Sequence, residues 1–575
     1  MWLINCSNYT LEPNEIDGPD AKPYLILSHT WGDEEVTFKE FTKYLNTAVE
    51  KKGFDKIRGI CQIALDHGYN YVWVDTCCID KSSSAELTES INSMFYWYSK
   101  ADRCIAYLYD LQPSSGSFHP SKDELRRCRW FTRGWTLQEL IAPSDVVFYD
   151  RTWKPRGSKN ELCDVIHAIT DIDKDTLMWP GKLPRIPIAR KMAWAANRNS
   201  TRIEDKAYSL LGLFGIFMPL IYGERERAFI RLQELIAQKT NDMSLFAWRD
   251  IHYDRSQTEY SGLFANDPSW FTECTTIARI YDPVIPSPSW IMTNAGIEIT
   301  TALDWSEISQ GYRLYLHCTY SGVDADQDDD PLVLSIWLRK TSSGFVRYKP
   351  NEVCLQSQSK TRFGYSSLLS IATSLTQREL SDVVRFYHPQ SHLLNSAISF
   401  SWKDVASPEL VCHQTYHPQH LWDHQQRCFF TSSHSRFIGL VELQISNAWG
   451  NQEWKRTCWI LCGLMMPTIS QFSEWAETSE AGLRPWVMVI KQNDDGSLGG
   501  LEGHKYGDLL DPFRLSTIGH KLRARFGSEP PTAGDCVLRY DAQRCLEVSA
   551  LILSVSEQLQ KGRTIEVIIV KSTIS

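Results

Sequence analysis

The first 150 residues alternate between two hydrophobic periods. Short runs of consecutive apolar residues are typical of strands covered on both faces of a sheet. These runs lie at residues 24–27, 71–74, 104–108 and 146–149. Between them, apolar residues recur every three or four positions and predict helices at residues 56–67, 86–100 and 135–141. The alternation predicts a mainly parallel sheet of the TIR or flavodoxin-like kind, an α/β domain over residues 1–155.

The pattern changes twice further along the chain. Helical periodicity continues without strand signals through residues 156–245, which we expect to form a helical extension, with helices at residues 161–169, 188–197, 204–214 and 224–239. From residue 255 to residue 575, strand patterns dominate, at residues 296–300, 312–316, 332–337, 437–443, 457–461, 486–490 and 565–570. This region is expected to be a sandwich or a barrel. A faint resemblance between residues 296–337 and 439–490 suggests two similar halves.

Composition narrows the classes of protein. The chain is 43% hydrophobic and 22% charged, which is typical of a globular protein. Its 69 acidic residues exceed its 60 basic ones, and the net charge of -9 argues against a nucleic-acid partner. We expect a cytoplasmic protein without a membrane span, because the first residues lack a secretory signal and the apolar stretch 207–222 is short and broken by Gly and Pro. The 16 cysteines form no convincing metal-binding pairs, so we expect buried thiols and no metal site.

Candidate chemistry gathers where the predicted strands end. Ligands of open parallel sheets bind beyond the carboxyl ends of the strands. The residues at these ends, together with an acid in the helix at 135–141, are Ser28, His29, Trp31, Asp75, Cys77, Cys78, Asp110 and Glu139. Spacing alone leaves open whether Glu139 is functional or a solvated carboxylate, and whether Asp75 binds a ligand or caps its loop. Cys77 or Cys78 with His29 is a further candidate nucleophile pair, against the commoner role of buried structural cysteine.

Six ordered, Trp-rich blocks resemble one family, the fungal heterokaryon-incompatibility (HET) domain. They are residues 24–32, 73–81, 86–98, 129–143, 202–212 and 222–225. The resemblance covers roughly residues 1–245. It implies a cell-death effector that acts in non-self recognition in filamentous fungi.

HET domains in turn look like remote relatives of TIR domains, some of which hydrolyse NAD with a Glu in a Trp-bearing helix. Matched by motif, that residue falls on Glu139. The resemblance implies NAD as a candidate substrate and no resident cofactor, with Ser28, His29, Trp31, Asp75 and Trp135 as binding residues. Nicotinamide leaves as a neutral group, so the reaction needs a carboxylate near the cationic ribose more than it needs an acid.

Other interpretations stay open at this point. The domain can signal by homotypic assembly without chemistry, as a homo-oligomer, or act as a hydrolase through Cys77 or Cys78. The β-rich region can be an inhibitor, an oligomer interface, or a sensor of a ligand or protein partner. The acidic segment 324–330 is either a calcium loop or a solvated turn.

Overall fold

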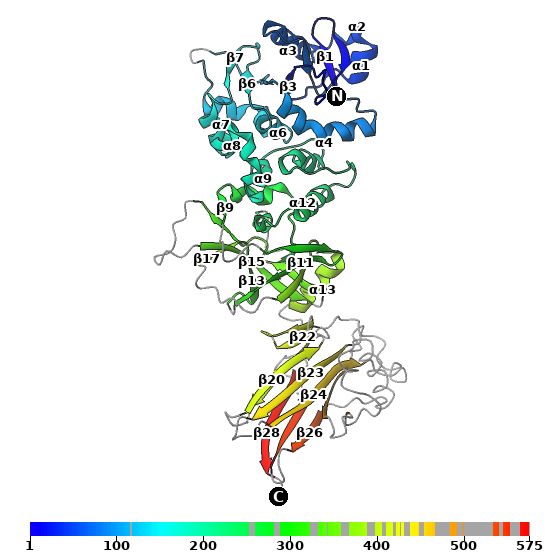
Figure 1. Cartoon of the computed structure of the whole chain (residues 1–575), viewed down its shortest axis with the longest axis vertical. Helices are drawn as coiled ribbons and strands as arrows, with labels where there is room; N and C mark the ends of the chain where they lie inside the picture. The colour runs from blue at the N-terminus through cyan, green and yellow to red at the C-terminus, as the bar shows by residue number, and fades with distance from the viewer. Residues whose placement is uncertain are drawn as a thin grey trace.

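The computed structural model of the chain has the N-terminal α/β unit at one end and the last β-sheets at the other (Figure 1). The structure describes residues 1–114, 118–251, 259–280, 288–306, 308–321, 332–341, 343–357, 367–387, 397–404, 410–417, 421–425, 427–430, 437–447, 454–465, 484–491, 498, 533–539, 544–552 and 564–573. The acidic segment 324–330 lies outside these residues.

The N-terminal unit is built on a seven-stranded mixed sheet of order β2-β1-β4-β3-β5-β6-β7. Its strands are β1 (Trp2–Asn5), β2 (Thr10–Pro13), β3 (Leu25–His29), β4 (Tyr71–Trp73), β5 (Arg103–Tyr107), β6 (Val146–Tyr149) and β7 (Pro155–Ser158). Strands β3 to β6 are parallel, whereas β1, β2 and β7 add antiparallel edges. Numbered along the chain, the parallel strands run 2-1-3-4, the start of the flavodoxin-like order. The α/β prediction is confirmed.

Helices follow the parallel strands as the periodicity predicts. They are α3 (Phe54–Asp66), α4 (Ser84–Lys100) and α6 (Thr136–Ile141). The sequence analysis missed α1 (Phe38–Lys43), α2 (Leu45–Ala48), α5 (Lys122–Arg127) and the 3₁₀ helix η1 (Arg129–Thr132). Helices α1 and α5 each begin with a capping box, in which a Thr or Ser side chain accepts from the third residue of the helix and a Glu there reaches back.

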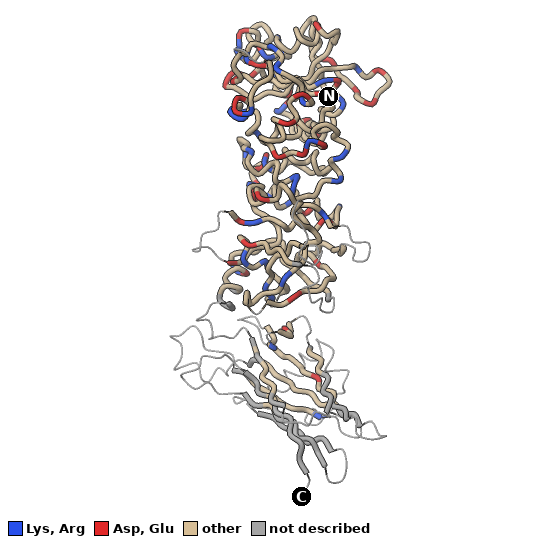
Figure 2. The backbone as a smooth tube through the Cα atoms, turned by 90° about the vertical axis from the view of Figure 1, so that its left-hand side faces the viewer, with Lys and Arg blue, Asp and Glu red and all other residues tan. Residues whose placement is uncertain are grey.

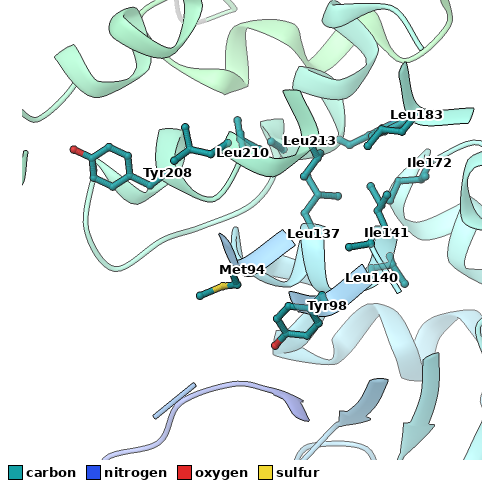
Figure 3. Packing of buried hydrophobic residues seen from close by; sticks show 14 of the residues in the cluster. Met94, Tyr98, Leu137, Leu140, Ile141, Ile172, Leu183, Tyr208, Leu210 and Leu213 are labelled. Atoms are coloured by element: carbon teal, nitrogen blue, oxygen red, sulfur yellow. The ribbon is translucent and has the colours of Figure 1, made fainter. Parts of the chain in front are cut away.

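A bundle of short helices follows. It contains α7 (Cys163–Thr170), α8 (Lys174–Met178), η2 (Pro180–Arg185), α9 (Ile188–Ala196), α10 (Asp205–Tyr208), α11 (Leu211–Phe214), α12 (Arg227–Lys239) and η3 (Met243–Phe246). The expected helix at 204–214 is therefore two short ones. Figure 3 shows α6 packed on this bundle, with Leu137, Leu140 and Ile141 beside Leu183 and Leu213. Burial on both sides fixes α6 between the sheet and the bundle.

The next unit is a nine-stranded sheet. Its main path is β10 (Trp290–Thr293), β11 (Gly296–Thr301), β18 (Ser367–Ile371), β16 (Gly344–Tyr348), β15 (Leu332–Thr341), β13 (Gly311–Tyr315) and β12 (Asp304–Ser306). Strands β8 (Tyr260–Ser261) and β17 (Cys354–Ser357) pair with β16 and β15. A separate two-stranded sheet joins β9 (Ile277–Arg279) to β14 (Cys318–Tyr320). The 3₁₀ helix η4 (Pro268–Cys274) precedes β9 in the chain, and α13 (Gln377–Tyr387) follows β18.

Two further sheets form the C-terminal part. One has the order β21 (Trp422–Asp423), β22 (Cys428–Phe430), β19 (Ala397–Asp404), β28 (Thr564–Thr573), β27 (Arg544–Ile552), β26 (Ala533–Arg539). The other has the order β20 (Leu410–His417), β23 (Ile438–Asn447), β24 (Trp454–Met465), β25 (Arg484–Lys491). Both contribute to one apolar cluster, which makes them a sandwich. The strands that the structure describes close no barrel, so the sandwich is the correct alternative for this part.

One apolar core joins the N-terminal sheet, the helical bundle and the nine-stranded sheet. Among the described residues, a single cluster of buried apolar side chains draws its members from all three parts, from Leu3 of β1 to Ile371 of β18. Arg347 of β16 lies fully buried with its guanidinium 3.5 Å from the ring of Trp248, and it donates to the carbonyl oxygens of Phe246 and Trp248 at 2.7 and 2.5 Å. The bundle and the nine-stranded sheet are thus parts of one interior. The division at residues 155, 245 and 255, and the two similar halves, stay predictions.

Figure 2 shows Lys and Arg interspersed with Asp and Glu along the N-terminal part of the chain. Within the described ranges, no helix combines the length and apolarity that a membrane crossing requires. The 13 cysteines whose side chains the structure describes are free thiols, and all of them are buried except the half-buried Cys354.

Candidate functional site

Ser28 and Glu139 meet at the carboxyl end of β3. Ser28 is the last residue but one of β3, a strand whose residues are all buried, and its hydroxyl donates to the carboxylate of Glu139 on α6. The same hydroxyl accepts from Nε1 of Trp130 in η1 at 2.7 Å. β3 is flanked by β4 on one side and β5 on the other, so this pair lies where the strand order reverses. Ligands of doubly wound sheets bind at such a switch point.

Both ends of α6 are held, which fixes the position of Glu139. At its start, the Thr136 hydroxyl donates to the carbonyl of Trp130 at 2.6 Å. Beyond its last turn, the buried ammonium of Lys159 donates to the carbonyls of Leu140 and Pro143 at 3.2 and 2.5 Å. Burial lowers the pKa of Lys159 to about 8. A lysine placed on these carbonyls satisfies groups that a helix end otherwise leaves unpaired.

Glu139 is only 7% exposed, and this burial dominates its chemistry. Loss of water raises the pKa of Glu139 to about 8, and the nearby charge of Asp75 adds to the rise. The hydrogen bond from Ser28, the Tyr98 hydroxyl and the charge of Arg133 oppose it. At pH 7 only about a tenth of the molecules carry an ionised Glu139. A carboxyl group tuned in this way at a strand end is a candidate for chemistry.

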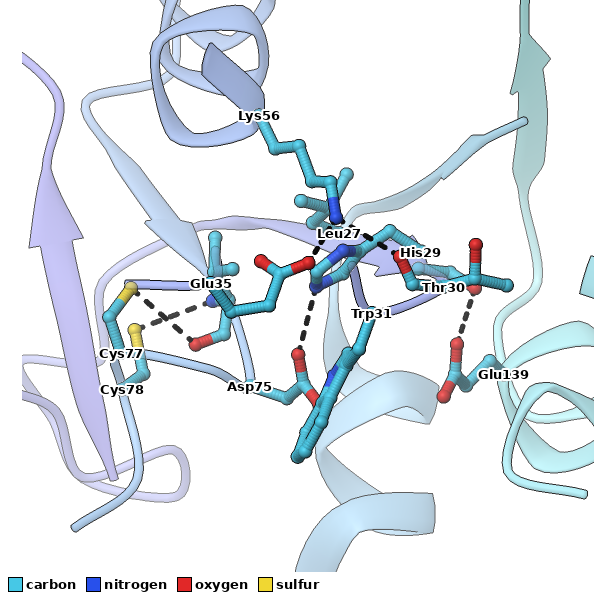
Figure 4. Close-up of polar contacts among 12 residues, drawn as sticks. Leu27, His29, Thr30, Trp31, Glu35, Lys56, Asp75, Cys77, Cys78 and Glu139 are labelled. Carbon is cyan, nitrogen blue, oxygen red and sulfur yellow. Dashed lines mark hydrogen bonds and ion pairs between the residues drawn. The ribbon is translucent and has the colours of Figure 1, made fainter. Parts of the chain in front are cut away.

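His29, Trp31 and Asp75 form a second polar group beside this pair. Nε2 of His29 lies 3.0 Å from one oxygen of Asp75, and the indole N–H of Trp31 donates to the other at 2.8 Å (Figure 4). Burial raises the pKa of Asp75, but the hydrogen bond and charge of His29 and the charge of Lys81 outweigh it, so the pKa lies below its usual value. Asp75 is therefore the ionised carboxylate of the site at neutral pH.

Trp31 gives the site an accessible aromatic face. Its side chain is 43% exposed, and Nζ of Lys81 lies 3.7 Å from the ring centroid. The loop that carries it is held by Lys56, which pairs with Glu35 and donates to the carbonyl of Thr30 at 3.0 Å. A partly exposed indole on a fixed loop can stack on a planar ligand.

Three arginines border the site, and the sequence analysis missed them. Arg129 of η1 donates to the carbonyl of Trp31 at 3.3 Å, and Arg133 lies close enough to Glu139 to lower its pKa. Arg198 is buried and donates to the carbonyl of Arg133 at 2.9 Å. The signal available in the sequence was the basic, aromatic run 129–133, next to the helix that carries Glu139.

The other residues expected at the site, Trp135, Cys77 and Cys78, make their contacts elsewhere. Trp135 is half-buried at the start of α6, and its polar contact is with Asp205 of α10. Cys77 and Cys78 are buried and turned toward the backbone of Val74, with Cys78 Sγ accepting its N–H at 3.3 Å (Figure 4). Burial raises the pKa of Cys77 well above its usual value, and His29 pairs with Asp75 instead. This arrangement gives no support to a thiolate nucleophile.

Comparison with known proteins agrees with this part of the fold. Residues 24–123 match the model of the family described as heterokaryon incompatibility protein (HET). The chain carries a HET domain. Residues 227–286 also match a domain of unknown function, DUF8212, which spans the join between the bundle and the nine-stranded sheet.

A curated relative supports the assignment of the HET domain. The chain is 41% identical over 290 residues to vegetative incompatibility protein HET-E-1 of Podospora anserina. The match covers 49% of this chain but only 21% of that protein. No solved structure matches the chain significantly. The family match at residues 24–123 covers Ser28, His29, Trp31 and Asp75. Glu139 follows those residues and joins the site through the fold.

Proposed function

We propose that this protein is a heterokaryon-incompatibility effector that acts in the cytoplasm and whose HET domain cleaves NAD between nicotinamide and ribose. The contact of Ser28 with Glu139 at the switch point of the sheet carries the proposal. The likeness to an incompatibility protein supports the biological role. The TIR-like motif around Glu139 and the site described above support the reaction, and depletion of NAD is the step by which we expect it to cause cell death.

In the proposed reaction, the bond from ribose C1′ to the nicotinamide nitrogen breaks, and its electron pair stays on nicotinamide. A water oxygen bonds to C1′, and the proton of that water passes to solvent. Ionised Glu139 stabilises the positive charge that develops on the ribose, either directly or by accepting from its hydroxyls. Because NAD brings a cationic nicotinamide, its binding lowers the pKa of Glu139 and favours the ionised form.

The other residues of the site bind the substrate or hold its binding residues in place. Trp31 offers its exposed face to the base or the nicotinamide ring, and Asp75 holds the indole N–H of Trp31 in place. The Ser28 hydroxyl, held by Trp130, fixes the rotamer of Glu139. His29 orients Asp75 through its Nε2.

The test is NAD consumption by the purified full chain, alone and after clustering through a fused oligomeric tag. Glu139→Gln is expected to lower the rate by about a hundredfold or more, the scale of losing one key electrostatic group. Glu124→Gln, an exposed capping residue of α5, is the matched control and retains the wild-type rate. Unchanged turnover in Glu139→Gln removes this residue from the reaction.

Expression in a filamentous fungus separates the proposal from signalling by assembly alone. We expect growth arrest with loss of cellular NAD for the wild type and neither for Glu139→Gln. Arrest by Glu139→Gln without loss of NAD identifies a non-catalytic module that acts by homo-oligomerisation.

A further inference from the structure

Arg129, Arg133 and Arg198 lie at the edge of the site and make no ion pair with an acidic side chain that the structure describes. Arg129 is exposed, Arg133 is half-buried and Arg198 is buried. Most other buried or half-buried arginines of the N-terminal part pair with a carboxylate, as Arg103 does with Asp145 and Arg190 with Asp173. Among the described residues, none of the three lies within 4.0 Å of a carboxylate oxygen. Such a group is unexpected in a chain with a net charge of -9.

The arginines also act on one another. Burial lowers the pKa of Arg133 and the charge of Arg129 lowers it further, whereas the charges of Asp205 and Glu139 offset only part of this fall. Arg198 is 8% exposed, and its Nη2 has no hydrogen-bond partner among the residues that the structure describes. Like charges held together, with an unused buried donor, cost free energy that a bound anion recovers.

Their placement defines where that anion lies. Arg129 contacts the loop of Trp31, and Arg133 is close enough to Glu139 to influence its pKa. Arg198 holds the backbone between them and α6, because its Nη1 donates to Arg133 O and to the Thr136 hydroxyl at 2.9 and 3.0 Å. The basic group therefore borders the site from the exposed indole to the buried carboxyl.

We propose that Arg129 and Arg133, with Arg198 behind them, form a subsite for the diphosphate of a nucleotide ligand. Guanidinium groups bind phosphate oxygens through paired, charge-assisted hydrogen bonds. A base on Trp31 and a ribose at Glu139 are joined by a diphosphate in a dinucleotide, so the subsite selects dinucleotides and diphosphate sugars over nucleosides. This inference rests on the proposed function for the identity of the ligand, but it makes a claim about binding that needs no turnover.

The direct test is calorimetric titration of the full chain with ADP-ribose, adenosine and inorganic pyrophosphate. Arg129→Gln and Arg133→Gln are each expected to weaken ADP-ribose binding about tenfold or more, the scale of one charge-assisted hydrogen bond. Adenosine binding stays as in the wild type, and added salt weakens ADP-ribose binding less in the variants. Arg127→Gln, an exposed arginine in the last turn of α5, removes the same charge nearby and is the matched control.

Arg133→Lys adds a check on geometry, since it keeps the charge but loses the planar fork, and it should bind with intermediate affinity. Wild-type binding by both Gln variants, or equal losses in Arg127→Gln, overturns the subsite, as does a wild-type chain that binds no ADP-ribose. Pyrophosphate binding without a preference for ADP-ribose also overturns it, because the subsite is then a general anion site.

Turnover separates this inference from the proposed function. Arginine-dependent binding of ADP-ribose by a protein that never cleaves NAD supports the subsite and refutes the hydrolase. NAD cleavage with an unchanged KM in both Gln variants supports the hydrolase and refutes the subsite.

Discussion

Replacement of Glu139 by Gln should make the protein more stable, and increasingly so as the pH rises. Gln has nearly the same shape and can still accept from Ser28, so the change removes the ionisable group and little else. In the folded protein the pKa of Glu139 is about 8, against 4.5 for the free side chain. The folded state therefore binds the proton more tightly than the unfolded state, and stability falls as the pH rises from about 4.5 to about 8.

The size of the effect follows from the two pKa values. Each pH unit between them costs about 1.4 kcal/mol of unfolding free energy. At pH 7 the wild-type carboxyl destabilises the fold by about 3 kcal/mol relative to a group that does not titrate. Between pH 5 and pH 7 the advantage of Glu139→Gln should widen by about 2–3 kcal/mol, and it should level off above pH 8.

Urea unfolding followed by tryptophan fluorescence at pH 5, 7 and 8.5 measures this difference, since Trp130 contacts the same hydroxyl as Glu139. Glu124→Gln is the control. Hydrogen bonds from Ser121 lower the pKa of Glu124, so the stability that it contributes is present above 4.5 and lost only at lower pH. Its difference from wild type should stay constant over this range. A constant difference for Glu139→Gln as well would refute the buried, titrating carboxyl.

Three further predictions follow from neighbouring features. The kcat/KM for NAD should rise about tenfold per pH unit up to about pH 8, because the reaction needs ionised Glu139. Initial rates of NAD cleavage between pH 6 and pH 8 measure this rise, and a kcat/KM that does not change over this range contradicts the role of Glu139. Gly212→Ala should lower the thermal midpoint and cost about 1–3 kcal/mol, because an added Cβ meets the side chain of Phe95 at 2.1 Å, whereas Gly181→Ala, with open space around it, should not. Arg347→Met should cost about 3 kcal/mol or more and speed limited proteolysis near residue 250, because two buried carbonyls lose their donor; an unchanged digestion pattern contradicts the connection through Arg347.

The sequence predicted the parallel core of the sheet well because four apolar runs have no other simple interpretation. It did not predict β1, β2 or β7. β2 is exposed or half-buried and β7 contains Pro155 and Gly157, so neither shows an apolar run, and each pairs with a single neighbour at an edge of the sheet. The helix expected at 204–214 breaks after α10, since tertiary packing there overrides a continuous apolar pattern.

The site was predictable in part, for the same physical reason. Strand ends gather in space whatever their separation along the chain, so Ser28, His29 and Asp75 were expected together, and the structure places Glu139 beside them. A sequence does not show which arginines lack an ion pair in the folded protein. The arginines therefore became visible only when their neighbours were known, and so did the hydrogen bond from Trp130 to Ser28.

The core shared by the helical bundle and the nine-stranded sheet limits how such proteins can be recombined. A chimera cut near residue 250 would split the shared apolar core and leave the guanidinium of Arg347 without its carbonyl partners. Exchange of the C-terminal sandwich alone, after α13 ends at Tyr387, leaves that interior whole. Other C-terminal units should therefore be tolerated when they are grafted beyond this helix and not when they are grafted before it.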